Sequence, residues 1–120
     1  MEIKTDLYLG DSKEELRKLI DNSVDLVITS PPYADQRKST YGGIHPDKYV
    51  DWFLPISEQL LRVVKPTGTF ILNIKEKVLE GERSTYVMEL IIAMQTRLAV
   101  DRRIYLAQEK FIPGKMAKSL

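Results

Sequence analysis

Residues 24–33, with the sequence VDLVITSPPY, decide the fold. The first half is short, apolar and rich in β-branched side chains, which is typical of a strand buried on both faces of a parallel sheet. Two consecutive prolines follow, and the strand must end there because neither can donate an N–H to a neighbour. Ligands bind beyond the carboxyl ends of strands in open α/β sheets. We therefore expect chemistry at the four residues that close the stretch, Ser30, Pro31, Pro32 and Tyr33.

Composition narrows the class of protein. The chain has 120 residues, enough for one domain, and is 43% hydrophobic and 29% charged. Its net charge of +1 argues neither for nor against a polyanionic partner. There is no cysteine, and His45 is the only histidine, so we expect neither disulfides nor a metal site. No signal peptide and no apolar run of roughly 20 residues is present, which predicts a cytoplasmic protein without membrane contact.

The residues before this stretch predict a strand and a helix. Residues 3–9 alternate loosely between apolar and polar side chains, as a strand does. Ser12, with Glu15 three residues later, has the spacing of a capping box, so a helix should begin there. Strand, helix and strand in succession predict a parallel βαβ unit.

The residues after it continue the alternation. Residues 34–43 are polar and predict a loop, and residues 45–64 have helical apolar spacing with Pro55 as a kink or break. A turn at 65–68, a strand at 69–74, a helix at 85–98 and a strand at 103–107 follow. The sum is half of a doubly wound α/β fold, with about four mostly parallel strands flanked by about three helices.

Three segments carry a family resemblance: LGDS at 9–12, NSVDLVITSPPY at 22–33 and VKPTGTFILNI at 64–74. They closely resemble S-adenosylmethionine-dependent DNA methyltransferases that act on exocyclic amino groups, whose catalytic motif is (Asp/Asn/Ser)-Pro-Pro-(Tyr/Phe). The resemblance covers residues 7–95. It implies a partial Rossmann-like methyltransferase fold, with residues 1–120 as a single partial catalytic domain. Serine in the first motif position favours cytosine-N4 over adenine-N6 as the target.

The chemistry of the motif fits these residues. An amino group on a base ring is a poor nucleophile, because its lone pair is delocalised into the ring. The Ser30 hydroxyl and the Pro31 carbonyl can accept hydrogen bonds from that amine, and the prolines hold both acceptors in place. The target base of double-stranded DNA must flip out to reach them, and Tyr33 offers a face for stacking.

Further residues acquire roles through the resemblance. It implies that Asp11, Thr29 and Ser30 lie near the cofactor, although a helix cap explains Asp11 nearly as well. The cations Arg37 and Lys38, with Tyr41 nearby, are candidates for contact with DNA. Solvated loop charges account for the two cations equally well.

One family feature is absent from the sequence. The aromatic-x-Gly-x-Gly turn that binds the cofactor does not occur, and the only Gly-Gly pair, at 42–43, follows no strand. We therefore expect a truncated or split form whose sheet is completed by a second polypeptide or by self-association, because an open strand edge invites pairing. The alternatives are a non-catalytic DNA-binding or scaffold subunit, an inactive remnant, or adenine-N6 specificity.

Overall fold

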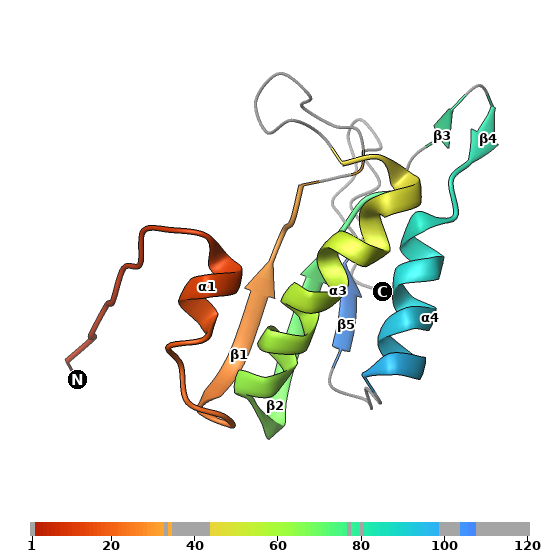
Figure 1. Ribbon diagram of the computed structural model, residues 1–120. Helices are drawn as coiled ribbons and strands as arrows, with labels where there is room; N and C mark the ends of the chain where they lie inside the picture. Colours follow the sequence, from red (N-terminus) through yellow and green to blue (C-terminus); the bar gives the residue numbers. More distant parts are fainter. Residues whose placement is uncertain are drawn as a thin grey trace, which may run out of the picture.

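A three-stranded parallel sheet forms the centre of the molecule (Figure 1). The computed structural model describes residues 2–32, 34, 44–76, 78–79, 81–98 and 104–107. The sheet has the order β1-β2-β5 and consists of β1 (Val24–Thr29), β2 (Val64–Asn73) and β5 (Ile104–Ala107). A two-stranded antiparallel hairpin, β3 (Val78–Leu79) and β4 (Glu82–Arg83), lies outside it.

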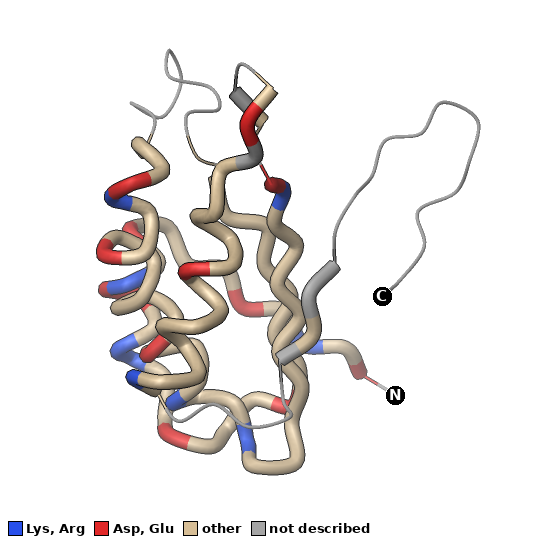
Figure 2. The backbone as a smooth tube through the Cα atoms, turned by 90° about the vertical axis from the view of Figure 1, so that its right-hand side faces the viewer, with Lys and Arg blue, Asp and Glu red and all other residues tan. Residues whose placement is uncertain are grey.

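Three helices accompany the strands. They are α1 (Ser12–Leu16), α3 (Pro46–Val63) and α4 (Tyr86–Arg97). Figure 2 shows α3 and α4 on one side of the strands. The predicted α/β class, the two long helices and the strands at 24–29 and 103–107 are confirmed to within a residue or so.

Parallel register brings the carboxyl ends of the strands to one edge. Thr29 pairs with Leu72, and Leu72 pairs in turn with Leu106. The register shifts near Asp25, where β2 passes close to β1: a Cβ on Gly68 would lie 3.0 Å from the Asp25 carbonyl oxygen, so only glycine fits. The predicted turn at 65–68 is therefore wrong, because these residues belong to β2.

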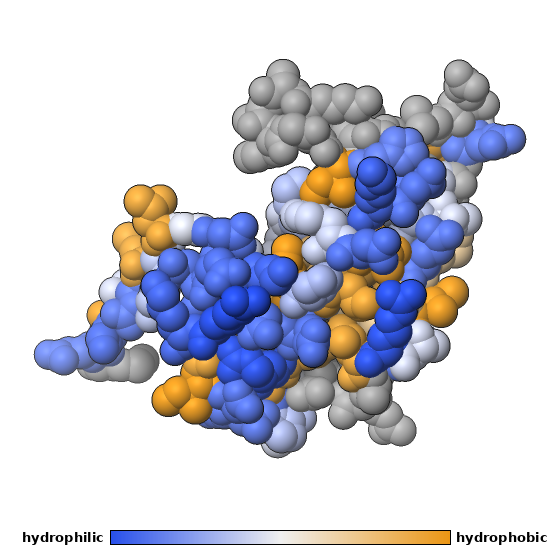
Figure 3. All heavy atoms as spheres, viewed as in Figure 1, coloured by the Kyte–Doolittle hydropathy of each residue, from blue (hydrophilic) through white to orange (hydrophobic). Residues whose placement is uncertain are grey.

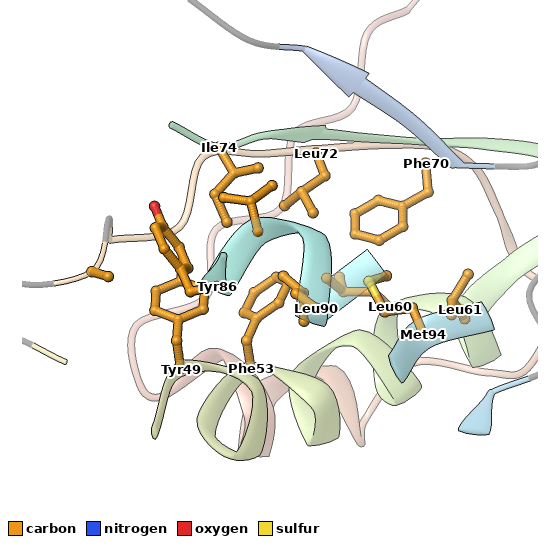
Figure 4. Packing of buried hydrophobic residues seen from close by; sticks show 12 residues of the cluster. Tyr49, Phe53, Leu60, Leu61, Phe70, Leu72, Ile74, Tyr86, Leu90 and Met94 are labelled. Atoms are coloured by element: carbon orange, nitrogen blue, oxygen red, sulfur yellow. The ribbon is translucent and has the colours of Figure 1, made fainter. Parts of the chain in front are cut away.

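The core lies between the sheet and the two long helices (Figure 4). Phe70, Leu72 and Ile74 alternate along β2 and its end, and each is fully buried. From the helices come mainly aromatic and aliphatic side chains: Tyr49, Phe53, Leu60, Leu61, Tyr86, Val87, Leu90 and Met94. The 3.6-residue apolar spacing of both helices accounts for this packing.

The N-terminal segment differs from the prediction. Residues 3–9 form no strand, and Figure 1 shows the segment running away from β1. Ile3, Leu7 and Leu9 are 87%, 92% and 101% exposed. Alternation fixes which side chains share a face, but a strand forms only beside another strand. The segment pairs with no described strand and lies apart from the free edge of β1, so the strand does not form.

Two further expectations fail for physical reasons. Helix α1 is capped by Asp11, whose side chain accepts from the Lys13 N–H at 2.8 Å, so Ser12 lies inside the first turn and is not the cap. Strand β1 is not buried on both faces, since Leu26 and Ile28 are 51% and 67% exposed. Described helices cover only the other face.

The described residues contain neither a membrane-spanning helix nor a cluster of metal ligands. No helix among them is long and apolar enough to cross a membrane. No group of three or more His, Cys, Asp or Glu side chains in those ranges is placed to hold a metal ion.

Candidate active site

A rigid turn follows β1 at the carboxyl edge of the sheet. Ser30 is exposed, Pro31 is buried and Pro32 is half-buried. Ala34 is fully buried and belongs to the core cluster. The buried Pro31 and Ala34 thus anchor the turn, while Ser30 is exposed to solvent.

The two proline carbonyls of the turn differ in their hydrogen bonding. The Tyr49 hydroxyl donates to the Pro32 carbonyl oxygen at 2.6 Å. Within the described ranges, no donor is bonded to the Pro31 carbonyl or to the Ser30 hydroxyl. The Ser30 hydroxyl and the Pro31 carbonyl are therefore neighbouring acceptors without a described donor, whereas the Pro32 carbonyl already accepts a hydrogen bond.

The end of β2 lies beside this turn, because Thr29 pairs with Leu72. One residue further, the side-chain oxygen of Asn73 is buried without a hydrogen-bond partner in the described part of the chain. After the strand, the Tyr86 hydroxyl donates to the Lys75 carbonyl. Asn73 pairs with Ala107 of β5 and shares the open face of the sheet with Ile71.

Asp11 lies at the start of α1, which Figure 1 places toward the same edge as the end of β1. Its carboxylate caps the helix but is exposed to solvent. No residue of α1 is fully buried, although Leu16 packs partly against the core, so polar bonds add to the docking of this helix. Arg62 of α3 supplies them by donating to the Leu16 carbonyl at 2.8 Å and to the Leu19 carbonyl at 2.9 Å.

A surface pair also steadies α1. Glu15 accepts from the Lys18 ammonium at 2.9 Å, and this hydrogen bond, with the attraction between the charges, raises the pKa of Lys18.

Four predicted site residues lie outside the described residues: Tyr33, Arg37, Lys38 and Tyr41. The structure brings Thr29, Ser30, Pro31 and Pro32 together as one turn, with Asp11 on a separate element at the same edge. Sequence reasoning missed the roles of Tyr49 and Asn73. The signal for Tyr49 was a tyrosine at a helical core position where phenylalanine would fill the same space.

Comparison with known proteins gives consistent matches. Residues 24–116 match the family model N6_N4_Mtase, described as DNA methylase. The Type II methyltransferase M.PvuII of Proteus hauseri is 40% identical over 90 residues, which is 73% of this chain and 27% of that protein. The DNA adenine methyltransferase YhdJ of Escherichia coli (strain K12) is 35% identical over 81 residues, covering 64% of this chain and 27% of the relative.

A solved structure matches as well. The PvuII DNA methyltransferase, described as cytosine-N4-specific, superposes with a TM-score of 0.61 at 39% identity. The match covers 73% of this chain and 32% of that chain. The described fold therefore corresponds to about a third of a methyltransferase structure.

Proposed function

Because the chain belongs to the DNA methylase family N6_N4_Mtase, we propose that it is the catalytic half of a site-specific DNA methyltransferase, acting as one partial domain over residues 1–120. Its target is an exocyclic base amine, and we favour cytosine N4 over adenine N6 as that target. The observation that carries the proposal is the exposed Ser30 hydroxyl on a fixed Pro-Pro turn at the carboxyl end of β1.

The turn acts as an acceptor site for the amine. The Ser30 hydroxyl and the Pro31 carbonyl accept the two amine hydrogens, which draws the nitrogen toward tetrahedral geometry and exposes its lone pair. Both acceptors are held before substrate arrives, so little reorganisation is needed. No strong base is required, because the proton leaves after methyl transfer. Tyr33 stacks on the flipped base, and Arg37, Lys38 and Tyr41 contact the DNA backbone.

The described residues supply only part of a pocket for S-adenosylmethionine, which contributes the methyl group when bound. Asp11 is the N-cap of α1, Thr29 ends β1 and Ser30 follows it, so a carboxylate and two hydroxyls are candidates for contact with the cofactor. The Asp11 carboxylate already accepts from the Lys13 N–H, and no glycine-rich turn occurs in the sequence. The cofactor therefore needs residues beyond these.

The partner we propose is a polypeptide with the remaining part of the methyltransferase fold, either a separate chain or a continuation of this one. Three features support it. Strand β1 is an edge strand in the described sheet, with a row of unpaired backbone groups. Its outward side chains Leu26 and Ile28 are exposed and apolar. Finally, this chain spans about a quarter of the curated relatives' length.

Calorimetry and reconstitution test the proposal. We expect no binding heat when the isolated chain meets millimolar S-adenosylmethionine. Adding a polypeptide with the glycine-rich half should restore methyl transfer to DNA. Ser30→Ala should lower the restored rate by about 100-fold, in line with the loss of one preorganised polar contact to the reacting group.

The matched control is Thr67→Ala. Thr67 is also an exposed hydroxyl of the sheet, but it lies toward the amino end of β2, so its rate should stay at the wild-type level. Full activity of the Ser30→Ala assembly would refute the assignment of the turn. DNA binding with no methyl transfer in any assembly would favour the non-catalytic DNA-binding or scaffold subunit. Self-association of the isolated chain, with no capture of the second half, would show that copies of this chain close the edge.

A further inference from the structure

Two buried tyrosines tie the ends of the two central strands. Tyr49 comes from the first turn of α3 and Tyr86 from the first residue of α4, and they are 0% and 1% exposed. Their ring centroids lie 4.8 Å apart at 61°, an edge-to-face contact. Figure 4 shows the two rings side by side at the end of the core near Ile74.

Each hydroxyl bonds a backbone carbonyl just beyond a strand. Tyr49 donates to Pro32, three residues after β1, and Tyr86 donates to Lys75, two residues after β2. Since Thr29 and Leu72 are register partners, these two carbonyls follow adjacent strands. One aromatic pair thus holds both strand ends at a fixed separation.

The hydrogen bond from Tyr49 to the Pro32 carbonyl is important because the described part of the turn has few other hydrogen bonds. Pro31 and Pro32 have no N–H, so the backbone there cannot donate to the sheet. The Tyr49 bond fixes the peptide plane that leaves Pro32. With Pro31 and Ala34 buried, this plane sets the direction of the turn and the tilt of the neighbouring Pro31 carbonyl.

We propose that Tyr49 is the positioning residue of the catalytic turn, with Tyr86 holding the adjacent strand end; this role rests on the proposed function. By occupying the Pro32 carbonyl, Tyr49 leaves the Pro31 carbonyl and Ser30 hydroxyl as the acceptor pair for the amine. Core packing alone does not explain the two hydroxyls. Phenylalanine would fill the same volume, and a buried hydroxyl is unfavourable unless it is bonded.

The first test uses the full chain without any partner. Tyr49→Phe removes one oxygen and keeps the ring, so the protein should remain folded. With proline carbonyl carbons labelled by ¹³C, the Pro32 signal should shift upfield, as a carbonyl that loses its donor does. The Ala34 amide should exchange with deuterium roughly two- to tenfold faster, matching the loss of one hydrogen bond.

Tyr86→Phe is the matched control. It removes the same atom from the same aromatic pair, but it should leave the Pro32 signal and Ala34 exchange at wild-type values, while faster exchange should appear at Glu76. The proposal is overturned if Tyr49→Phe leaves both Pro32 and Ala34 unchanged. It is also overturned if the two variants alter them equally.

The second test measures kinetics in the reconstituted enzyme. Tyr49→Phe should lower kcat by about 10- to 100-fold with KM for S-adenosylmethionine unchanged, because a misplaced acceptor affects the reacting amine and not cofactor binding. A loss confined to KM would contradict a positioning role. Should the wild-type assembly be inactive, the proposed function fails, while the carbon signal of Pro32 still decides whether Tyr49 holds the turn.

Discussion

The two faces of the sheet differ in how completely they are covered. On one face, α3 and α4 bury Phe70, Leu72 and Ile74 to 0% exposure. On the other face, Leu26, Ile28 and Tyr105 are 51%, 67% and 55% exposed. The side chains are similar in chemistry on both faces, so sequence alone does not separate them.

One face of the sheet is therefore packed within the chain, and the other face has no described element packed on it. The covered face also holds Tyr49, whose hydroxyl donates to the Pro32 carbonyl of the turn that we propose to be catalytic. We propose that the cofactor-binding half packs on the open face. This face also contains Asn73, whose side-chain oxygen is buried without a partner in the described ranges.

The largest expected effect distinguishes the two faces directly. Leu72→Ala should lower the free energy of unfolding by about 2–5 kcal/mol, because it leaves a cavity in the covered core. Ile28→Ala should cost less than about 1 kcal/mol, since that side chain is mostly in solvent. Urea denaturation of the isolated chain measures both. Equal losses would mean that the open face is covered in solution.

An intermediate effect concerns Asn73. Replacing it with leucine should raise the free energy of unfolding by about 1 kcal/mol, because a buried amide oxygen without a donor is removed. The variant should lose methyl transfer in the reconstituted enzyme if that oxygen binds a donor on the second half or the substrate. Destabilisation of the isolated chain would contradict the structure, because it would mean that Asn73 already has a partner there.

The confirmed predictions concern elements whose packing partners lie within the described residues. The helical spacing around Phe53 and Leu90 predicted α3 and α4, and these helices pack on each other and on the sheet. The alternation at residues 3–9 and the apolar run in β1 were equally clear patterns. Residues 3–9 form no strand because the segment lies apart from the free edge of β1. Strand β1 is exposed on one face because no described helix covers that face.

Some features of the candidate site follow from the local sequence, and others depend on how the elements pack. The sequence predicts a rigid turn at Ser30, Pro31 and Pro32 without the fold, since two prolines after a strand constrain the backbone by themselves. The catalytic role of these residues stays a prediction. The bond from Tyr49 joins residues 17 apart and depends on how α3 docks, so no local pattern could reveal it. The capping role of Asp11 was weighed against a cofactor role, and the structure provides evidence for the cap.

The most direct test is mass spectrometry of nucleosides from DNA treated with the reconstituted enzyme and methyl-labelled S-adenosylmethionine. The account predicts labelled N4-methylcytosine, whose rate of formation falls about 100-fold with Ser30→Ala and stays at the wild-type level with Thr67→Ala. Labelled N6-methyladenine would keep the mechanism and change the target base. No labelled nucleoside from an assembly that binds both DNA and cofactor would contradict the claim that this chain carries the catalytic half.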